Sequence, residues 1–588
     1  MRLKTIFALE LAVFVAGFFW YGLNRFRLGI DLTDEGAYLA WPLRVYLGEA
    51  PFSSELLTLV RPVEVYLSLL FKLHPTVTLY ELRLFGWGIH LLAFSVLACF
   101  LFRLSGAPLR SLLVASLPLF VSHIFGLAPP SYNTLSSDFL TIALSLWGIA
   151  SLDQRYRFPL GAAIGTALFI ATFSHPGLGL VAAVIMVHEV WLGRLVRNFR
   201  SGQLTAPNIG VLIFLGCWLI FIGYFWGSGA LATWTQRMAH NQTTVSFKES
   251  LPAFLGHLLV YPFVYSHLAM VLGAAVLLTA GFVLQRSKSD RTTGSRTVLG
   301  IVLVTALSVS FSLETGFFLM CFVMISLMAA GVHFMPPWAP LIPGPPGVRF
   351  LMLLSGLAAL VYAALTHYFD LYRSWMSGVL GLPFAFATGF ILLVSVKPRR
   401  PTLKDLLLPA TLALVVLCAA RDHYRNIQRD ASPQELHAGF TIPKLRSLKS
   451  TPERIRALNE LYHYLRLAIA PGDRLIAYDD CPMLYYIFDA QPAYGLAWAA
   501  RYGHPPATLA RLNDELNSRP LPRYAVRTLV DVSRPVWRTA ARTTYAQYPL
   551  DETVAAHYEL ERTIFPFEIW RLRTAAPREK TSPTPPGS

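Results

Sequence analysis

The chain has 588 residues, of which 54% are hydrophobic and only 14% charged, and its mean hydropathy is +0.48. A soluble core cannot bury so much apolar surface, and much of it lies in runs of about twenty residues, the length that crosses a bilayer as a helix. The formal net charge of +16 fits contact with anionic headgroups, so no nucleic-acid partner is expected. The composition predicts a polytopic membrane protein.

The apolar runs predict about thirteen transmembrane helices. They lie near 5–23, 81–102, 111–128, 133–151, 159–174, 177–193, 208–227, 262–284, 297–313, 317–334, 350–369, 374–396 and 404–420. The first run lacks a small-residue cleavage site and is interpreted as a retained helix rather than a signal peptide. The pairs in 159–193 and 297–334 could instead be re-entrant.

Lys and Arg gather in every second connection, from Arg2 and Lys4 to Arg399 and Arg400. Because basic residues mark cytoplasmic loops, the N-terminus is expected in the cytoplasm. The first loop, 24–80, and everything after residue 420 are then extracytoplasmic. We expect an integral protein of the inner or plasma membrane.

The first loop has three carboxylates within five residues, Asp31, Asp34 and Glu35, and is also rich in Lys and Arg. Thr33 is placed to cap a helix whose apolar stripe follows, and 63–73 is a second apolar stretch too short to span. Both are interpreted as interfacial helices. On spacing alone, two interpretations stay open: the acids cap a surface helix and pair with arginines, or they serve a ligand.

Polar side chains also lie at the predicted outer ends of the spans. An acid within a span, such as Asp138, is a site hypothesis, although helix caps and satisfied interhelical partners need no ligand. The candidate substrate contacts among them are Tyr132, Asn133, Asp138, His175 and Glu314.

After the last run the composition becomes mixed. Residues 451–470 have helical spacing, and "PGDRLIAYDD", "RYAVRTLVD" and "FEIWRLR" read as strands. The expected organisation is a transmembrane domain over 1–420, an extracytoplasmic α/β domain over 421–575 and a disordered tail over 576–588. The sequence shows no P-loop, GxGxxG or GxSxG motif, so a lipid-linked donor is favoured over a nucleotide-linked one.

The segments "TDEGAYLAWPLRVYLGEAPF", "VRPVEVYLSLLFKL" and "LYELRLFGWGIHLLAFSVLACFLFRLSG" resemble the N-terminal third of the GT-C glycosyltransferases. The likeness is to the group with protein O-mannosyltransferases and the lipid A aminoarabinose transferase. Its Asp-Glu, basic-Pro and Arg-Leu elements match Asp34-Glu35, Arg61-Pro62 and Arg83-Leu84. Family members often continue Asp-Glu with Ala-Arg-Tyr, whereas this chain has Gly36-Ala37-Tyr38, so any role of that arginine must be filled elsewhere.

The resemblance implies a GT-C-like fold and an inverting transferase. The enzyme would move a sugar from a polyprenyl-phosphate donor to a lipid, glycan or protein acceptor on the extracytoplasmic face. A phosphate leaving group needs no second carboxylic acid, so one base and cations for the phosphate suffice. The implied base is Asp34, with Glu35 orienting the acceptor or binding a metal. The implied ligands of the donor phosphate are Arg61, Lys72 and Arg83, and Tyr38 is a further candidate substrate contact.

No cofactor is required by this chemistry, and a divalent metal ion stays open. Two other classes remain as alternatives. A polysaccharide polymerase or ligase predicts its main chemical loop later in the chain. A flippase or transporter of lipid-linked sugars predicts inverted repeats and broken helices, and neither is evident in the sequence.

Overall fold

The computed structural model describes residues 2–49, 63–121, 129–191, 198, 200–201, 203–229, 346–365, 379–394, 403–495, 506–537 and 549–573, with single gaps at 154, 382, 428 and 480. The chain divides into two compact units. Unit 1 comprises Met1–Leu28, Leu56–Leu67 and Val77–Gln428, and unit 2 comprises Gly29–Glu55, Ser68–Thr76 and Arg429–Ser588. The first loop is therefore divided between the two units, and its acidic segment belongs to unit 2 with the C-terminal part of the chain.

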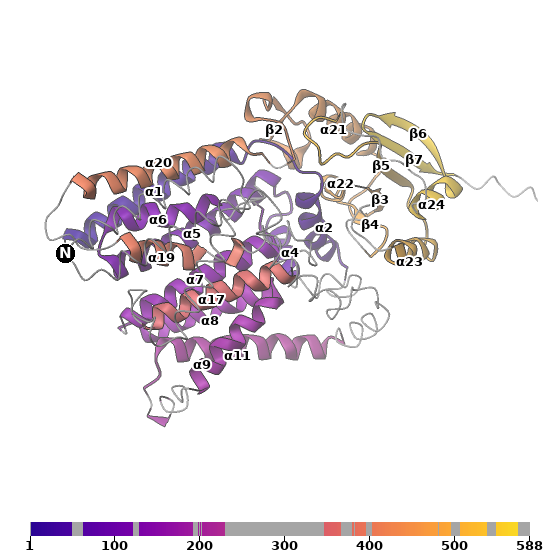
Figure 1. Cartoon of the computed structure of the whole chain (residues 1–588). Coiled ribbons are helices and arrows are strands. Elements are labelled where there is room, and N and C mark those ends of the chain that lie inside the picture. Colours follow the sequence, from indigo (N-terminus) through magenta and orange to yellow (C-terminus); the bar gives the residue numbers. More distant parts are fainter. Residues whose placement is uncertain are drawn as a thin grey trace, which may run out of the picture. The chain divides into compact units, whose positions relative to one another are not determined.

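The described part of unit 1 is helical (Figure 1). Its helices are α1 (Arg2–Arg25), α5 (Leu79–Ser105), α6 (Pro108–Val121), α7 (Tyr132–Leu152), α8 (Arg157–Ser174), α9 (Gly179–Trp191), α11 (Ala206–Gly227), α17 (Pro346–Leu365), α19 (Pro383–Val394) and α20 (Leu403–Arg425), with short 3-10 turns η1 (Pro176–Leu178) and η3 (Val379–Gly381). Helix α4 (Val63–Leu73) crosses the boundary between the units.

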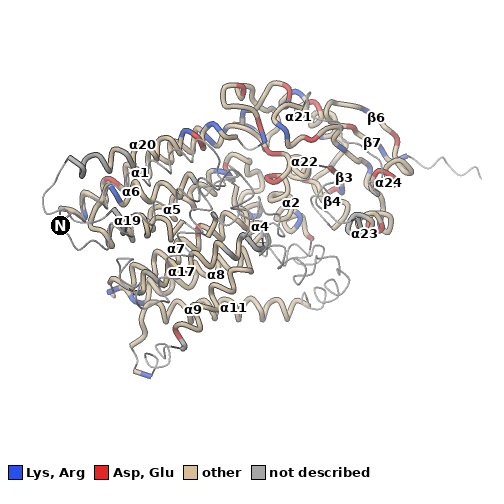
Figure 2. Tube along the Cα trace, in the orientation of Figure 1, with Lys and Arg blue, Asp and Glu red and all other residues tan. Residues whose placement is uncertain are grey.

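Among the described helices, 5 are long and apolar enough to cross a membrane: Leu3–Arg25, Leu79–Ser105, Tyr132–Leu152, Arg157–Ser174 and Ala206–Gly227. Charged residues are sparse along them in Figure 2. Helix α1 exposes Leu9, Val13 and Trp20, which suits lipid as solvent. This pattern is that of an integral membrane protein.

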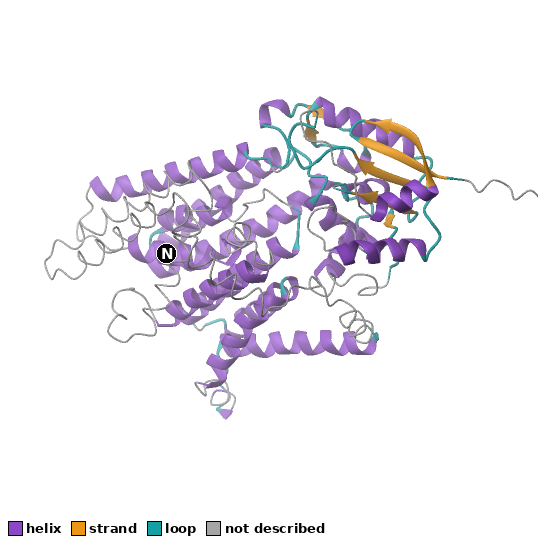
Figure 3. Cartoon of the chain, turned by 45° about the vertical axis from the view of Figure 1, so that its right-hand side comes forward, coloured by secondary structure: helices purple, strands orange, loops and turns teal. Residues whose placement is uncertain are grey.

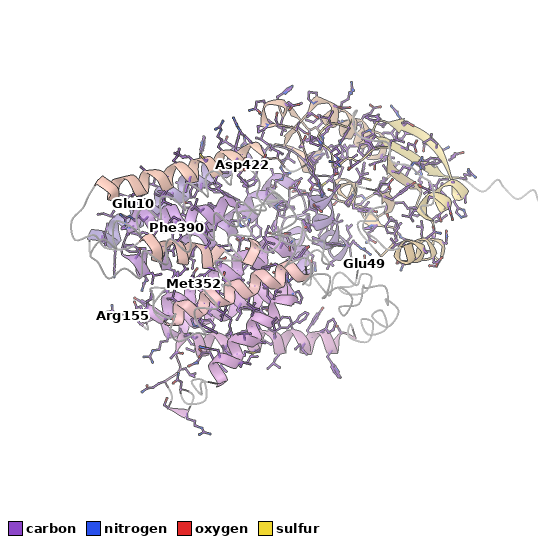
Figure 4. All side chains as sticks on the ribbon, viewed as in Figure 1. Glu10, Glu49, Arg155, Met352, Phe390 and Asp422 are labelled. Carbon is purple, nitrogen blue, oxygen red and sulfur yellow. The ribbon has the colours of Figure 1, made fainter. Side chains whose placement is uncertain are left out.

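The other expected spans have mixed outcomes. Helices α6, α9, α17, α19 and α20 coincide with expected runs, and Met352 of α17 and Phe390 of α19, both labelled in Figure 4, are buried. The runs 262–284, 297–313 and 317–334 lie outside the described residues. The count of about thirteen therefore stays a prediction.

Local chemistry accounts for where these helices start and how closely they pack. Helices α5, α7 and α11 each begin with a capping box, in which a side chain and the backbone satisfy each other's first-turn groups. Where α8 meets α11, a Cβ added to Gly165 would lie 2.4 Å from the carbonyl oxygen of Gly210. Small residues at this crossing let the two backbones approach, as is usual between membrane helices.

Unit 2 contains the strands (Figure 3). A five-stranded sheet has the order β4-β3-β5-β7-β6, in which β3 is parallel to β4 and β5, and the remaining pairs are antiparallel. Its strands are β3 (Arg474–Tyr478), β4 (Gln491–Pro492), β5 (Tyr524–Thr528), β6 (Tyr558–Ile564) and β7 (Phe567–Leu572), and β1 (Ala438–Gly439) pairs separately with β2 (Lys449–Ser450). The three strands expected from sequence are confirmed as β3, β5 and β7.

The helices of unit 2 are α2 (Asp34–Tyr46), α21 (Pro452–Leu465), α22 (Met483–Phe488), α23 (Pro506–Asn517) and α24 (Pro549–His557), with 3-10 turns η4 (Pro433–Glu435) and η5 (Pro443–Leu445). Helix α21 confirms the helical spacing of 451–470. Helix α2 of the first loop packs against α22 and β4. It is buried on most sides, so it is a packed part of unit 2, and its relation to a membrane surface stays a prediction.

Candidate active site

The acidic cluster lies where α2 begins. Thr33 occupies the N-cap position, but its side chain makes no capping hydrogen bond. Instead its hydroxyl donates to Asp31 Oδ1 at 2.6 Å, and its backbone N–H donates to the same oxygen at 2.9 Å. Asp31 is buried and shapes the turn that leads into the helix. The expected cap therefore acts on the preceding acid rather than on the helix.

The two acids of the first turn differ in exposure. Glu35 is 2% exposed, and its Oε2 accepts the N–H of Asp31 at 3.3 Å. The Asp34 side chain is 19% exposed. Tyr38, one helical turn further on, is also only partly buried. Asp34 and Tyr38 thus share the more accessible face of α2, while Glu35 points into the protein.

A guanidinium from the C-terminal segment reaches this cluster. Arg429 Nη2 lies 2.9 Å from Asp34 Oδ2, and Arg429 Nη1 lies 3.5 Å from Asp31 Oδ1 and hydrogen-bonds the Thr33 hydroxyl. Its backbone is left-handed, with φ 54°, a conformation uncommon for a residue with a side chain. One arginine therefore contacts both carboxylates on either side of Thr33.

The residue after Arg429 holds the chain just before the cluster. Asp430 Oδ2 accepts the N–H of Ile30 at 2.9 Å and the hydroxyl of Ser450 at 2.7 Å. Arg454 donates to the carbonyl oxygen of Ile30 at 3.2 Å and lies 3.5 Å from Asp430 Oδ1. Burial lowers the pKa of Arg454, and the charges of Asp430 and Asp31 oppose that shift. Both backbone groups of Ile30 are thereby bound by the C-terminal part of unit 2.

Close packing holds α2 against α22. A Cβ on Gly36 would lie 2.2 Å from the backbone nitrogen of Met483, so only glycine fits there. The N–H of Met483 donates to the carbonyl oxygen of Leu32 at 3.0 Å. At the other end of α2, Arg44 binds both carboxylate oxygens of Glu49, labelled in Figure 4, at 2.5 and 2.8 Å. The helix that carries Asp34 is fixed at both ends.

The three residues expected at the donor phosphate have different surroundings. Arg83 is buried in unit 1, where its Nη1 donates to the carbonyl oxygens of Phe26 at 3.0 Å and Leu28 at 3.4 Å. Lys72 is exposed near the end of α4 in unit 2. The neighbouring Phe71 is buried, with its ring 6.1 Å from that of Tyr46. Arg61 lies outside the described residues.

Two expected substrate contacts meet in unit 1. The rings of Tyr132 and His175 stack at 6.1 Å, and His175 also meets the Tyr362 ring edge-on at 4.8 Å. The Tyr362 hydroxyl donates to Ser136 at 2.6 Å. Asn133 is buried near the start of α7, and its Oδ1 accepts no hydrogen bond from the residues that the structure describes.

Asp138 has a partner that the sequence interpretation missed. His90 Nδ1 of α5 lies 2.5 Å from Asp138 Oδ2 of α7, and both residues are buried. An ionisable side chain within an apolar span was the signal that could have identified His90. Glu314, the remaining candidate, lies outside the described residues.

Arg429, Asp430 and Arg454 were also missed. The segment "RDHYRNIQRD" at 421–430, directly after the last apolar run, contains the first two, and no motif in it predicts their contacts. A local pattern does not show which distant carboxylate an arginine meets. Within the described residues, no group of three His, Cys, Asp or Glu side chains is arranged to hold a metal ion. Asp31 and Asp34 instead share the Arg429 guanidinium.

Comparison with known proteins gives matches among solved structures. No protein-family model and no curated protein matches the chain. The chain is similar to ArnT from Cupriavidus metallidurans bound to undecaprenyl phosphate, at 10% identity and a TM-score of 0.39 over 96% of this chain and 97% of that one. ArnT in the apo state gives 12% identity and a TM-score of 0.40, over 96% and 98% of the two chains.

A third similar structure is the archaeal oligosaccharyltransferase AglB from Archaeoglobus fulgidus, in complex with an inhibitory peptide and a dolichol-phosphate. It matches at 13% identity and a TM-score of 0.40, over 90% of this chain and 70% of that one.

Proposed function

We propose that this chain is a membrane glycosyltransferase that moves a sugar from a polyprenyl-phosphate donor to a lipid, glycan or protein acceptor on the extracytoplasmic face. The observation that carries the proposal is the Asp34 carboxylate. It is partly exposed at the start of a fixed helix, in the segment that resembles the GT-C motif, and a guanidinium lies 2.9 Å away. The apolar helices place the chain in a membrane, which is also where such a lipid-linked donor is dissolved.

The proposed reaction is a single displacement at the anomeric carbon. The acceptor hydroxyl oxygen forms a bond to that carbon, and the bond from the carbon to the phosphate oxygen breaks with its electron pair leaving on the phosphate. The hydroxyl proton passes to Asp34, which acts as the general base. The sugar is inverted, and the products are the glycoside and free polyprenyl phosphate.

The other residues have supporting roles in this proposal. Tyr38 lines the accessible face of α2 and contacts the substrate. Glu35 is buried against the backbone of Asp31, so its proposed role is to hold the turn that leads into the helix carrying Asp34. Lys72 is exposed and suits the donor phosphate, as does Arg61 by its place in the motif. Arg83 has one terminal nitrogen bound to two backbone carbonyls, which favours a structural role.

Tyr132, Asn133, Asp138, His175 and Glu314 remain proposed substrate contacts. A divalent metal stays open, and no step of the proposed reaction passes through one.

The first test is turnover of a panel of polyprenyl-phosphate sugars by the purified chain and its Asp34→Asn variant. We expect the parent to release polyprenyl phosphate and Asp34→Asn to lose at least about 100-fold in rate, since a general base contributes about 10²- to 10⁴-fold. The matched control is Asp514→Asn, because Asp514 is exposed on α23 of the same unit. We expect this control to keep the parent rate.

Equal rates for the parent and Asp34→Asn would remove Asp34 from the reaction. A parent that is folded and inert toward every donor would contradict the transferase proposal and favour a transporter of lipid-linked sugars.

A further inference from the structure

The Arg429 guanidinium contacts the proposed base directly. Its Nη2 lies 2.9 Å from Asp34 Oδ2, whereas its Nη1 reaches Asp31 Oδ1 at 3.5 Å and the Thr33 hydroxyl. Two neighbouring carboxylates repel each other, and a cation shared between them offsets that repulsion. The planar guanidinium also fixes the plane of the oxygens it binds, which an ammonium group does not.

The backbone around Arg429 is built to deliver this side chain. Its φ of 54° lies in the left-handed region, which residues with a Cβ adopt rarely and mostly where the surroundings impose it. The next residue, Asp430, is held in place, because its carboxylate binds the N–H of Ile30, the hydroxyl of Ser450 and the N–H of Ala431. The same contacts hold Ile30, directly before Asp31. Asp430 thus connects the backbone next to Arg429 with the backbone next to Asp31.

The sequence of α2 gives an independent reason to look for this cation. The motif that the chain resembles often has arginine at the position of Ala37, whereas Ala37 is a buried alanine that cannot contribute a charge. Arg44, the one arginine of α2, is bound to Glu49 at the far end of the helix. The guanidinium at Asp34 comes from outside α2, from Arg429.

We propose that Arg429 is the positioning residue of Asp34, supplying from the C-terminal segment the guanidinium that α2 lacks. It holds the carboxylate of Asp34 in one orientation and balances its charge while the acceptor approaches. The inference rests on the proposed function for its catalytic consequence. It does not require Arg429 to touch the donor.

The first test needs no turnover. Carbodiimide-driven amidation of carboxyl groups, read by peptide mass spectrometry, is applied to the full-length parent and to Arg429→Gly. Glycine accepts the left-handed backbone, so this variant removes the guanidinium without adding strain. We expect amidation of Asp34 to rise severalfold in Arg429→Gly, while amidation of the exposed Asp514 stays constant.

The matched control is Ser447→Gly, since Ser447 also has a left-handed backbone, with φ 76°, and is exposed in the same unit. We expect Asp34 to be amidated in Ser447→Gly to the same extent as in the parent. Unchanged labelling of Asp34 in Arg429→Gly would overturn the inference. If Arg429→Gly does not fold, Arg429→Lys replaces it, and the same increase in labelling, smaller in size, is expected.

The second test uses turnover, where the parent has it. We expect Arg429→Gly to lose about 100-fold in kcat with little change in the KM for the donor, because small misplacements of a catalytic group cost about that much. Added guanidinium ion should restore part of the rate. In the Asp34→Asn background, Arg429→Gly should cost nothing further, since the group it positions is gone.

A raised KM with unchanged kcat would overturn the inference by making Arg429 a ligand of the donor. An additive loss in the double variant would do the same. A parent inert toward every donor would contradict the proposed function instead, and the labelling experiment would still decide whether Arg429 holds Asp34.

Discussion

At the scale of single residues, Gly36 occupies a position with no room for a side chain. A Cβ would lie 2.2 Å from the nitrogen and 2.6 Å from the Cα of Met483. These are backbone atoms and cannot move aside. We therefore expect Gly36→Ala to lower the free energy of unfolding by about 1–3 kcal/mol, as overpacked sites do. Thermal unfolding in detergent micelles measures the change.

The control for this prediction is Gly439→Ala. Gly439 lies in β1 of the same unit, and an added Cβ meets no atom within 4 Å. We expect its melting temperature to match that of the parent. A Gly36→Ala variant as stable as the parent would mean that α2 and α22 can separate without cost.

At the scale of elements, the edge of β3 is completed by a side chain of α22. Among the described residues, strand β4 pairs with β3 at Arg474 and Leu475, and Ala477 has no strand partner on that side. The Tyr485 hydroxyl takes its place, accepting the N–H of Ala477 at 3.1 Å and donating to its carbonyl oxygen at 2.9 Å. This contact ties α22, and with it the support of α2, to the sheet.

Tyr485 makes the stability of unit 2 depend on pH. Burial raises the pKa of its phenol above the ordinary 10.0, so the unfolded chain loses this proton first as the pH rises. The stabilisation is complete below about pH 10 and declines above it. We expect the slope of unfolding free energy against pH above 10 to be shallower in Tyr485→Phe, by up to about 1.4 kcal/mol per pH unit.

Denaturant titrations of the parent and Tyr485→Phe at several alkaline pH values measure the two slopes. Tyr156→Phe is the control, since Tyr156 is exposed at the start of α8. Identical slopes in the parent and Tyr485→Phe would show that this phenol is not held neutral by the fold.

At the scale of the whole molecule, the orientation in the membrane is a prediction from the charged loops. It places Arg155, labelled in Figure 4 between α7 and α8, in the cytoplasm, and Ser518 of unit 2 outside. Both positions are exposed. In a chain whose 5 cysteines are replaced by serine, we expect Ser518→Cys to react with an impermeant maleimide in intact cells. Arg155→Cys should react only after permeabilisation.

If only Arg155→Cys reacted in intact cells, the orientation would be the opposite of the predicted one. Such a result would also move the proposed chemistry to the cytoplasmic face, where a lipid-linked donor would have to be used before it is flipped.

Features that depend on neighbouring residues were predicted from the sequence, whereas contacts between distant residues were not. The strand around Tyr524 and the helix around Leu458 follow from short periodic patterns, and both are found. Asp34 at the start of a helix was equally local. Arg429 was not predicted as its partner, because nothing within a few residues of either shows the contact. His90 and Asp138 likewise belong to different helices and meet only through packing.

The sequence alone therefore determined that the chain is a membrane protein, because its apolar runs need a bilayer. It also determined local elements, such as the strands that the alternating pattern forms in the C-terminal part. Only the tertiary structure decided that Gly29–Glu55 packs as one unit with Arg429–Ser588, and that Arg429 meets Asp31 and Asp34. The physical reason is the distance along the chain over which each interaction acts. Hydropathy and periodicity act over neighbouring residues, whereas an ion pair across most of the chain exists only once packing has fixed both backbones.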